Sequence, residues 1–299
     1  MKRFRGSVLG VVLGLGLALA AAPKPALAQP DSLPRHLRDR EAGIPTSMLG
    51  TYVHRHQLLV LPFYEHVSDR NQEYNTAILG FGLNEDFRGK FRSSSEAIFI
   101  AYGLSDKVAL EFESAHMRAS LEKSPADPTA TPSRIEESGL SDLEGQLRLR
   151  LADERGRRPE IFGFVEVTAP TQKKKLLIGR KDWDARPGIG FIRGFTWGTM
   201  TIWSTFEYNR EKSAIQEAAH VDIGETSIEY LRRLSRSWRF SLAFEGGEGG
   251  APDEWELRPA LQGRLADGIF LKLINSVGVS SKAPDWTPQI GLMFSLPPR

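Results

Sequence analysis

The stretch 143-LEGQLRLRL-151 decides the fold, because apolar and polar side chains alternate along it. Successive side chains of a β-strand point to opposite faces, so the leucines share one face and Glu144, Gln146, Arg148 and Arg150 share the other. A helix would scatter the same leucines around its axis. The stretch therefore predicts a strand with one apolar face and one charged face.

The same alternation recurs along the chain from Arg55 onward, most clearly over 238–245 and 286–296. We expect about twelve strands, an even number, as single-chain bacterial membrane barrels have. The predicted strands are 55–66, 95–104, 107–121, 138–151, 159–170, 184–195, 198–210, 220–233, 236–248, 253–265, 268–280 and 285–296.

The connections alternate between tight turns, as at 104–107 and 265–268, and long polar segments, as at 122–137 and 172–183. This rhythm favours an up-and-down antiparallel transmembrane β-barrel with short periplasmic turns and long outer loops. A soluble sandwich shows the same alternation, so strand length, turn rhythm and aromatic placement decide between the two. We expect five tryptophans near strand ends to form aromatic girdles, namely Trp197, Trp203, Trp238, Trp255 and Trp286.

Three stretches are less regular. The alternation in 108–121 slips by one residue near Ser114, which predicts a β-bulge there. The glycine-rich stretch 185–194 predicts a bend or a close backbone contact. We assign 75–83 to the first outer loop, because a further strand there would break the even count.

The first 28 residues have the layout of a secretory signal peptide. A positive start at 2–5 precedes an apolar run over 7–22 and a cleavage site of small residues at 26–28. An uncleaved anchor is the alternative, but the run is shorter than the roughly 20 residues that span a bilayer. The chain thus divides into a signal peptide 1–28, a periplasmic N-terminal tail 29–54 and an outer-membrane barrel 55–299.

Composition excludes several classes of protein. The chain has no cysteine, so it has no disulfide framework and no thiolate metal site. Cleavage after residue 28 changes the net charge from +2 to −2, which offers no basic stripe for nucleic acid. We predict no cofactor and no metal site. His54 and His56 lie at i, i+2 with His66 beyond, but the sequence supplies no carboxylate cluster beside them.

The polar face supplies candidate residues for the barrel lumen. They could form a constriction that selects a small solute, or a salt-bridged and closed lumen with a structural role; both alternatives stay open, and the mixed signs argue against strong ion selectivity. The lumen candidates are Glu111, Glu113, Glu144, Arg148, Arg150, Glu207, Arg239, Glu256, Arg258, Arg264 and Lys272.

Other residues point outside the lumen. Lys173, Lys174 and Lys175 lie in a predicted outer loop, where they could contact lipopolysaccharide phosphates or simply be solvated. Ser114 and His116 share a strand face, as in outer-membrane phospholipases, but no orienting residue is evident. We therefore predict that the chain is not an enzyme.

The last strand resembles the C-terminal signal read by the barrel assembly machinery, which has the pattern polar-x-Gly-x-x-aromatic-x-hydrophobic. Gln289, Gly291, Phe294 and Leu296 occupy its positions. Leu296 departs from the usual terminal aromatic residue. The resemblance implies that this machinery is a partner of the chain.

Three further stretches resemble the outer-membrane transporter barrels named after the meta-pathway of phenol degradation. They are 102-YGLSDK-107, 139-GLSDL-143 and 168-TAPT-171 followed by Gly188-x-Gly190, and the resemblance covers about 55–296. Ser141 departs from the usual Gly-x-Gly-Asp form. The resemblance implies an outer-membrane barrel that passes small, often aromatic or hydrophobic solutes, surrounded by outer-membrane lipid and lipopolysaccharide. It names no catalytic residue.

Overall fold

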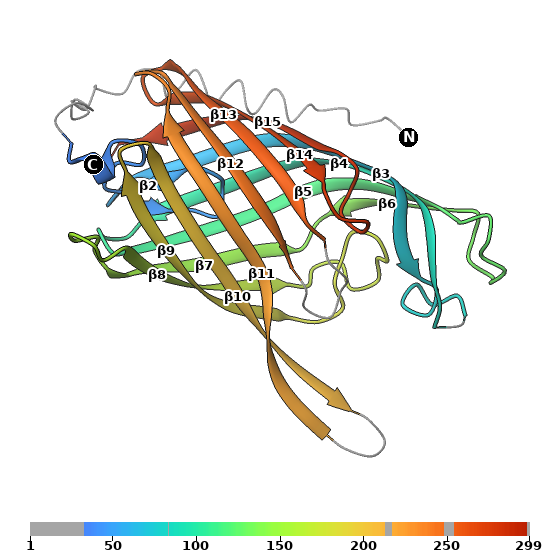
Figure 1. The fold of residues 1–299 in the computed structure, drawn as a ribbon. Coiled ribbons are helices and arrows are strands. Elements are labelled where there is room, and N and C mark those ends of the chain that lie inside the picture. Colours follow the sequence, from blue (N-terminus) through green and yellow to red (C-terminus); the bar gives the residue numbers. More distant parts are fainter. Residues whose placement is uncertain (1–32, 83, 213–216, 248–253, 298–299) are drawn as a thin grey trace.

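The computed structural model describes residues 33–297, except 83, 213–216 and 248–253. The predicted signal peptide at 1–28 lies outside this range. The regular secondary structure of the described chain is almost entirely strand (Figure 1). The wall strands are β3 (Leu58–Asn75), β4 (Asp86–Gly103), β5 (Val108–Glu122), β6 (Arg134–Leu140), β7 (Leu143–Ala152), β8 (Glu160–Ala169), β9 (Asp184–Phe195), β10 (Gly198–Lys212), β11 (Glu217–Arg233), β12 (Trp238–Gly247), β13 (Glu256–Ala266), β14 (Ile269–Gly278) and β15 (Thr287–Leu296).

The wall closes into an antiparallel, up-and-down barrel. Each strand pairs with its neighbour in sequence, and β15 pairs with β3 through Phe294 opposite Val60 and Leu296 opposite Leu58. β6 and β7 both pair with β5 and form one strand interrupted at 141–142, which gives twelve strands in the wall. The predicted fold and the even strand count are confirmed.

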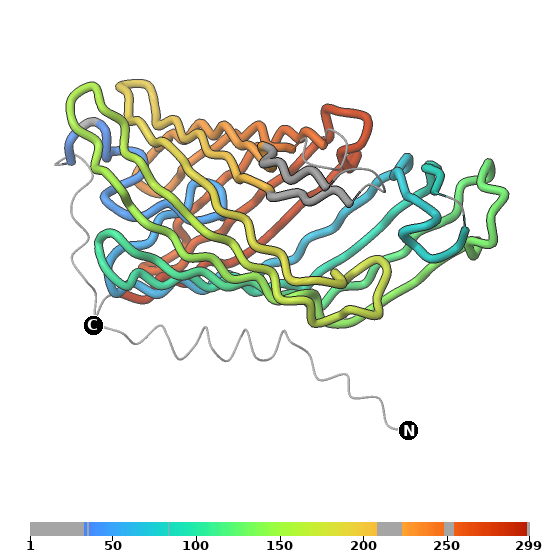
Figure 2. Tube along the Cα trace, turned by 90° about the horizontal axis from the view of Figure 1, so that it is seen from below, coloured from blue at the N-terminus to red at the C-terminus, as the bar shows by residue number. Residues whose placement is uncertain are grey.

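The barrel has two unlike ends, which we call the short-turn end and the long-loop end. The connections 104–107, 153–159, 196–197, 234–237 and 267–268 lie at the short-turn end. At the long-loop end, β3 to β6 project beyond β12 to β15 (Figure 2). Residues 76–82 form turns there, so the loop predicted at 75–83 is confirmed within the described residues.

The bulge predicted at Ser114 is wrong. β5 keeps one register with β4 from Ala109 to Glu122. The apolar residues change face because β5 leaves the apolar outer band, so that Leu121 packs inward with Tyr74 while Arg118 faces outward. The irregularity belongs to the neighbouring strand, where the Ser141 N–H donates to the Ala115 carbonyl at 2.6 Å.

The glycines of β9 permit close contact with the neighbouring strand β8. The sequence predicted either a bend or a close backbone contact for this stretch, and the structure shows the contact. A Cβ on Gly188 or Gly190 would lie 2.2 Å from the ring of Phe164 or Phe162. The two phenylalanine rings therefore lie directly against the β9 backbone.

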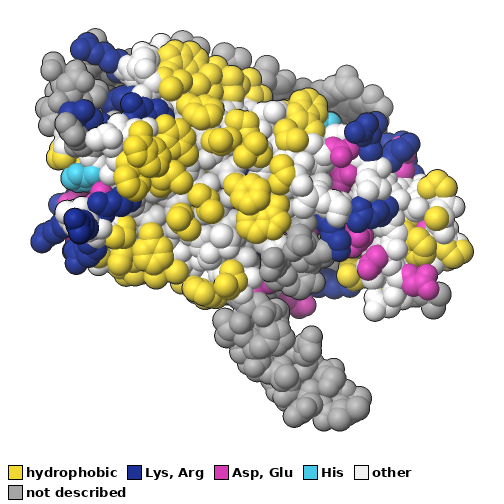
Figure 3. Space-filling model, viewed as in Figure 1, with side chains coloured by type: hydrophobic (Ala, Val, Ile, Leu, Met, Phe, Trp, Pro, Cys, Tyr) yellow, Lys and Arg dark blue, Asp and Glu magenta, His cyan; other side chains and the backbone are white. Residues whose placement is uncertain are grey.

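Hydrophobic side chains form a broad band around the outside of the wall, between charged ends (Figure 3). Trp197, Trp238 and Trp286 are exposed near strand ends, as expected for girdle residues. Trp203 contradicts that prediction, because it faces inward and packs edge-on against Phe164, with 5.7 Å between ring centroids. In the part of the chain that the structure describes, no helix is both long and apolar enough to cross a membrane.

Candidate functional site

Residues 33–57 lie inside the short-turn end of the barrel, and we call them the plug. The plug contains η2 (Arg35–Leu37), β1 (Ile44–Pro45) and β2 (Tyr52–Val53), which pairs with β1. The sequence predicted a tail over 29–54. From residue 33 onward the chain is instead packed against the interior wall, because side chains distant in sequence bind it.

Apolar side chains of the plug contact almost the whole circumference. Ile44 and Val53 pack against β3, β4, β5 and β15, and Tyr52 packs against β8, β9 and β11. Leu49 completes the ring by packing against β12, β13 and β14. The cavity left between the plug and the wall near Trp203 has a volume of about 20 Å³, comparable to one water. The plug therefore fills this cross-section of the barrel.

A buried ion triad holds the start of the plug. Arg40 is 1% exposed, and its guanidinium lies 3.0 Å from Glu154 and 2.9 Å from Glu160. Glu160 also pairs with Arg150 at 3.3 Å. Buried charges are tolerated only when they are paired, so this contact fixes the plug in one position.

Three charged wall residues bind the backbone and hydroxyl groups of the plug. Glu111 accepts hydrogen bonds from the Ser47 N–H at 2.9 Å and the Ser47 hydroxyl at 2.7 Å. Glu229 accepts one from the Gly50 N–H at 2.7 Å. Lys272 donates to the Leu49 carbonyl at 2.5 Å and to Thr51 Oγ1 at 2.7 Å. Each bond satisfies a polar group of a segment that has little secondary structure of its own.

Glu41 forms a second charged contact at the rim of the short-turn end. It lies 2.5 Å from Arg239 and 3.3 Å from His54. Burial alone would raise its pKa, but the hydrogen bond with His54 and the charges of Arg239 and Arg233 lower the pKa of Glu41 to about 2. Its backbone has φ of 65°, a strained value for a residue with a side chain.

The structure thus assigns most of the predicted lumen candidates to two groups. One group binds the plug: Glu111 directly, Arg148 through its 3.0 Å pair with Glu111, and Arg150 through the Ala42 and Gly43 carbonyls. Arg239 and Lys272 also belong to it. Arg264 belongs to neither group, because it pairs with Asp267 in the β13–β14 turn.

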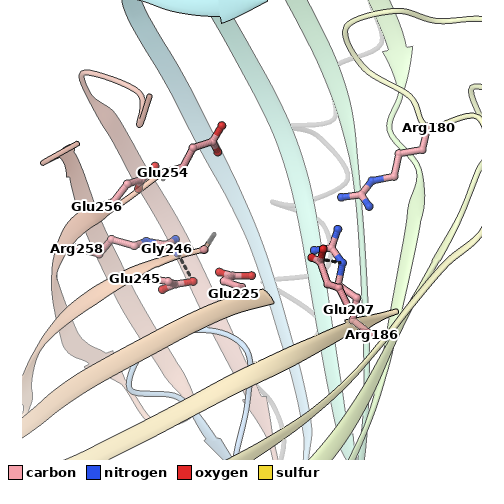
Figure 4. Close-up of a pocket in the computed structure, with 10 residues that line it drawn as sticks. Arg180, Arg186, Glu207, Glu225, Glu245, Gly246, Glu254, Glu256 and Arg258 are labelled. Carbon is pink, nitrogen blue, oxygen red and sulfur yellow. Dashed lines mark ion pairs between the residues drawn. The ribbon is translucent and has the colours of Figure 1, made fainter. Parts of the chain in front are cut away.

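The second group lines a cavity of about 430 Å³ on the long-loop side of the plug. Glu256 and Arg258 stand on one wall with Glu225, Glu245 and Glu254, opposite Glu207, Arg180 and Arg186 (Figure 4). Arg258 pairs with Glu245 at 3.0 Å, and Arg186 lies 3.7 Å from Glu207. Five carboxylates and three guanidiniums line this space, so acidic groups are in excess.

Glu113 and Glu144 extend the acidic interior. They are directly opposite each other on β5 and β7, on the same strand faces as Glu111 and Arg148. No ion pair to either carboxylate is formed by the residues that the structure describes. The interior above the plug is therefore acidic on several strands.

Sequence reasoning missed the plug residue Arg40 and its partners Glu154 and Glu160, as well as Glu229. Glu229 alternates with Ile228 and Tyr230 on β11, so its inward position was readable from the alternation. The contacts of Arg40 were not readable, because its nearest partner in the triad is 114 residues away.

The remaining candidates lie apart. His54 and His56 lie in a turn before β3, and His66 lies on the outer face of β3. In the described part of the chain, no three or more side chains are grouped so that they could hold a metal ion. Ser114 and His116 share the outer face of β5, and no hydrogen bond among the described residues joins them. Lys173 and Lys174 are exposed in the β8–β9 loop.

The described fold and its contacts define a closed twelve-stranded β-barrel with a folded internal plug. A crystal structure of an outer-membrane channel from Pseudomonas putida F1 is similar, with a TM-score of 0.55 at 13% identity, over 84% of this chain and 99% of that one. The translocator domain of the autotransporter NalP from Neisseria meningitidis has a TM-score of 0.49 at 12% identity, over 79% and 88%. The first likeness shows that the fold is shared with an outer-membrane channel. No family model and no curated protein matches the sequence.

Proposed function

We propose that the barrel lies in a bacterial outer membrane, with its short-turn end in the periplasm. The exposed apolar band fits the hydrocarbon layer, and both ends of the wall lie at the short-turn end, as in bacterial barrels. The signal-like first 28 residues agree with export. The assembly pattern at 289–296 lies on β15, whose pairing with β3 closes the wall, and this supports recognition by the barrel assembly machinery.

We propose that the barrel passes a small solute through its charged lumen, and that the plug closes the periplasmic side. The observation that carries the proposal is the 430 Å³ cavity directly above a plug held by ion pairs and hydrogen bonds. A hydrocarbon placed there would desolvate charged groups without replacing their hydrogen bonds. The lining thus favours a solute with a polar group, including the aromatic phenols that the family resemblance implies.

A closed barrel with a structural role in the envelope is the second candidate. The buried triad of Arg40, Glu154 and Glu160 favours it, because such a contact is costly to break. Neither function calls for a catalytic group, and we propose that the protein is not an enzyme.

A disulfide tether separates the two candidates. A Cβ on Gly50 would lie 3.6 Å from Cβ of Ser241 on β12, which is within the range of disulfides. Because the chain has no cysteine, Gly50→Cys/Ser241→Cys would create a single pair. Gly50 has φ of 63°, so the substitution costs about 1–2 kcal/mol of backbone strain.

The readout is the conductance of the refolded protein in planar bilayers of phosphatidylcholine. If the plug is a gate, the reduced double variant conducts in discrete steps and the oxidised one is silent. Ser241→Cys alone is the matched control, and oxidant should not affect it. Equal conductance of the oxidised and reduced forms would show that solute does not pass through the plug position. A silent wild type and a silent reduced variant, both folded and heat-modifiable, would establish the structural role.

A further inference from the structure

The outer face of β3 to β6 carries a polar groove immediately beyond the apolar band. The row Tyr64, Glu96, His116 and Leu140 is directly paired across these four strands and marks the edge of the band, since Tyr64 is 46% and Leu140 60% exposed. The next two rows contain His66, Ser94, Arg118, Ser138, Arg92 and Ser120. These side chains line an open cavity of about 540 Å³, which we call the outer basic groove.

Two guanidiniums in the groove lack counterions. Arg92 lies opposite Ser120 and Arg118 opposite Ser94, so the two arginines are diagonal neighbours on one face. Diagonal neighbours in a sheet are about 7–8 Å apart, within reach of long side chains, and like charges there repel. Both are exposed, and neither forms an ion pair or hydrogen bond with any residue that the structure describes.

The other charges that line the groove are engaged, whereas Glu96, in the row at the edge of the apolar band, is a diagonal neighbour of Arg118 but forms no ion pair with it. Arg134 pairs with Glu136 at 2.6 Å, and the carboxylate of Glu137 accepts the backbone N–H groups of Leu176 and Leu177. The free positive charge of the groove is therefore that of Arg92 and Arg118, beside the hydroxyls of Ser94 and Ser120. Paired guanidinium forks with hydroxyl donors match the oxygens of a phosphate group.

The distance of the groove from the edge of the apolar band indicates which phosphate group lies beside it. Arg118 lies two residues beyond His116, and Arg92 four beyond Glu96. At about 3.3 Å per residue and a tilt near 40°, these positions are about 5 and 10 Å above the edge of the apolar band. The polar headgroup layer extends roughly 5–7.5 Å beyond the hydrocarbon core on each side, so Arg118 lies within that layer and Arg92 lies just beyond it.

We propose that the outer basic groove binds a phosphate group of the glycolipid in the outer leaflet of the membrane. The proposal rests on the membrane placement proposed above, but it is independent of passage through the lumen, since the groove is outside the wall. It rests on side chains of β4 and β5, whereas the predicted contact at 173–175 rests on lysines of the β8–β9 loop, which adjoins the groove where Leu176 and Leu177 bind Glu137.

The test measures binding of fluorescent bisphosphorylated lipid A to the refolded full-length barrel in neutral detergent micelles. The variant is Arg92→Gln/Arg118→Gln, and the matched control is Arg155→Gln/Arg157→Gln, two exposed arginines of the turn at the opposite end. We expect at least about tenfold weaker binding by the first variant and unchanged binding by the control, since each arginine near an anionic lipid surface contributes a severalfold factor.

Two further arms separate the sources of binding. Dephosphorylated lipid A should bind the wild type as weakly as bisphosphorylated lipid A binds the variant; equal binding of the two lipids to the wild type would show that acyl chains alone are recognised. Competition by millimolar inorganic phosphate would assign the groove to free phosphate instead. Equal affinity of the groove variant and the wild type would overturn the proposal. Conductance of the groove variant in phosphatidylcholine bilayers should equal that of the wild type, so failure of the channel proposal is seen separately.

Discussion

Replacing Arg40 by Met tests whether the buried triad holds the plug. The guanidinium joins Glu154 and Glu160, whose side chains are 5% exposed. Removing one partner of such a buried pair costs about 3–5 kcal/mol. Glu160 keeps Arg150 at 3.3 Å, and Glu154 keeps the Gly194 N–H at 3.2 Å, so the lower value applies. A loss of about 3 kcal/mol shifts the balance between held and released plug about 100-fold.

The assay is single-channel recording, in which the ratio of open to closed time should rise about 100-fold if release of the plug opens the path. Arg40→Met/Glu154→Gln removes the carboxylate that has lost its cation, leaves Glu160 paired with Arg150, and should restore most of the closed state. Arg155→Met, at an exposed position, should leave the ratio unchanged. An Arg40→Met barrel that is folded and heat-modifiable, with a ratio within about threefold of the wild type, would refute the assignment of the triad to the plug.

Four further outcomes are expected. Because the pKa of Glu41 is lowered from 4.5 to about 2, its contacts stabilise the plug above pH about 4.5 and are lost as the pH falls toward 2. Open time should rise over that window, and Glu41→Gln should reduce this change; an unchanged pH profile would show that Glu41 does not hold the plug. Arg258→Gln should shift the reversal potential in a salt gradient toward cations, since its cavity already has excess carboxylates; no shift would place the ion path elsewhere. Tyr74→Phe leaves the Ser124 N–H without its acceptor and should destabilise the packing of Tyr74 with Leu79 and Leu121 at the long-loop end by about 1–3 kcal/mol. Proteolysis should then cleave the loops of the intact barrel faster than in the wild type. Replacing the lysines of 173–175 by Gln should increase detergent sensitivity of cells if the loop contacts lipopolysaccharide, whereas unchanged sensitivity would leave these lysines solvated.

Strand positions could be predicted from the sequence because a strand has a fixed period of two and the wall has one apolar face. The stretch 143–151 shows the limit of that rule as well as its use. Alternation places Arg148 on the inner face, but it does not say whether the interior holds water or protein. Trp203 was misplaced for a related reason, since a position near a strand end does not fix the face of the side chain.

The plug could not be predicted, because 33–57 has no period and little secondary structure. Its position comes from partners such as Glu229, which is 179 residues from Gly50. The change of face of the apolar residues near Ser114 is present in the sequence, but its interpretation as a β-bulge was wrong. An apolar set that changes face can mark the point where a strand leaves the lipid, as well as an extra residue in the strand.

The charged residues show a further limit of the sequence pattern, which gives the face on which a side chain lies but not its place along the barrel axis. The predicted lumen set contains both signs, and from the sequence its mixture argues against ion selectivity. In the structure most of the predicted cations, such as Lys272 and Arg239, are engaged with the plug, while Glu113, Glu144 and the carboxylates around Arg258 lie beyond it, so carboxylates are in excess there. Under the proposed passage, a solute that enters from the long-loop end meets these carboxylates before it meets the plug. The plug closes the path to every solute, so plug variants should change open time. The carboxylates of the cavity favour cations over anions, so cavity variants should change ion selectivity.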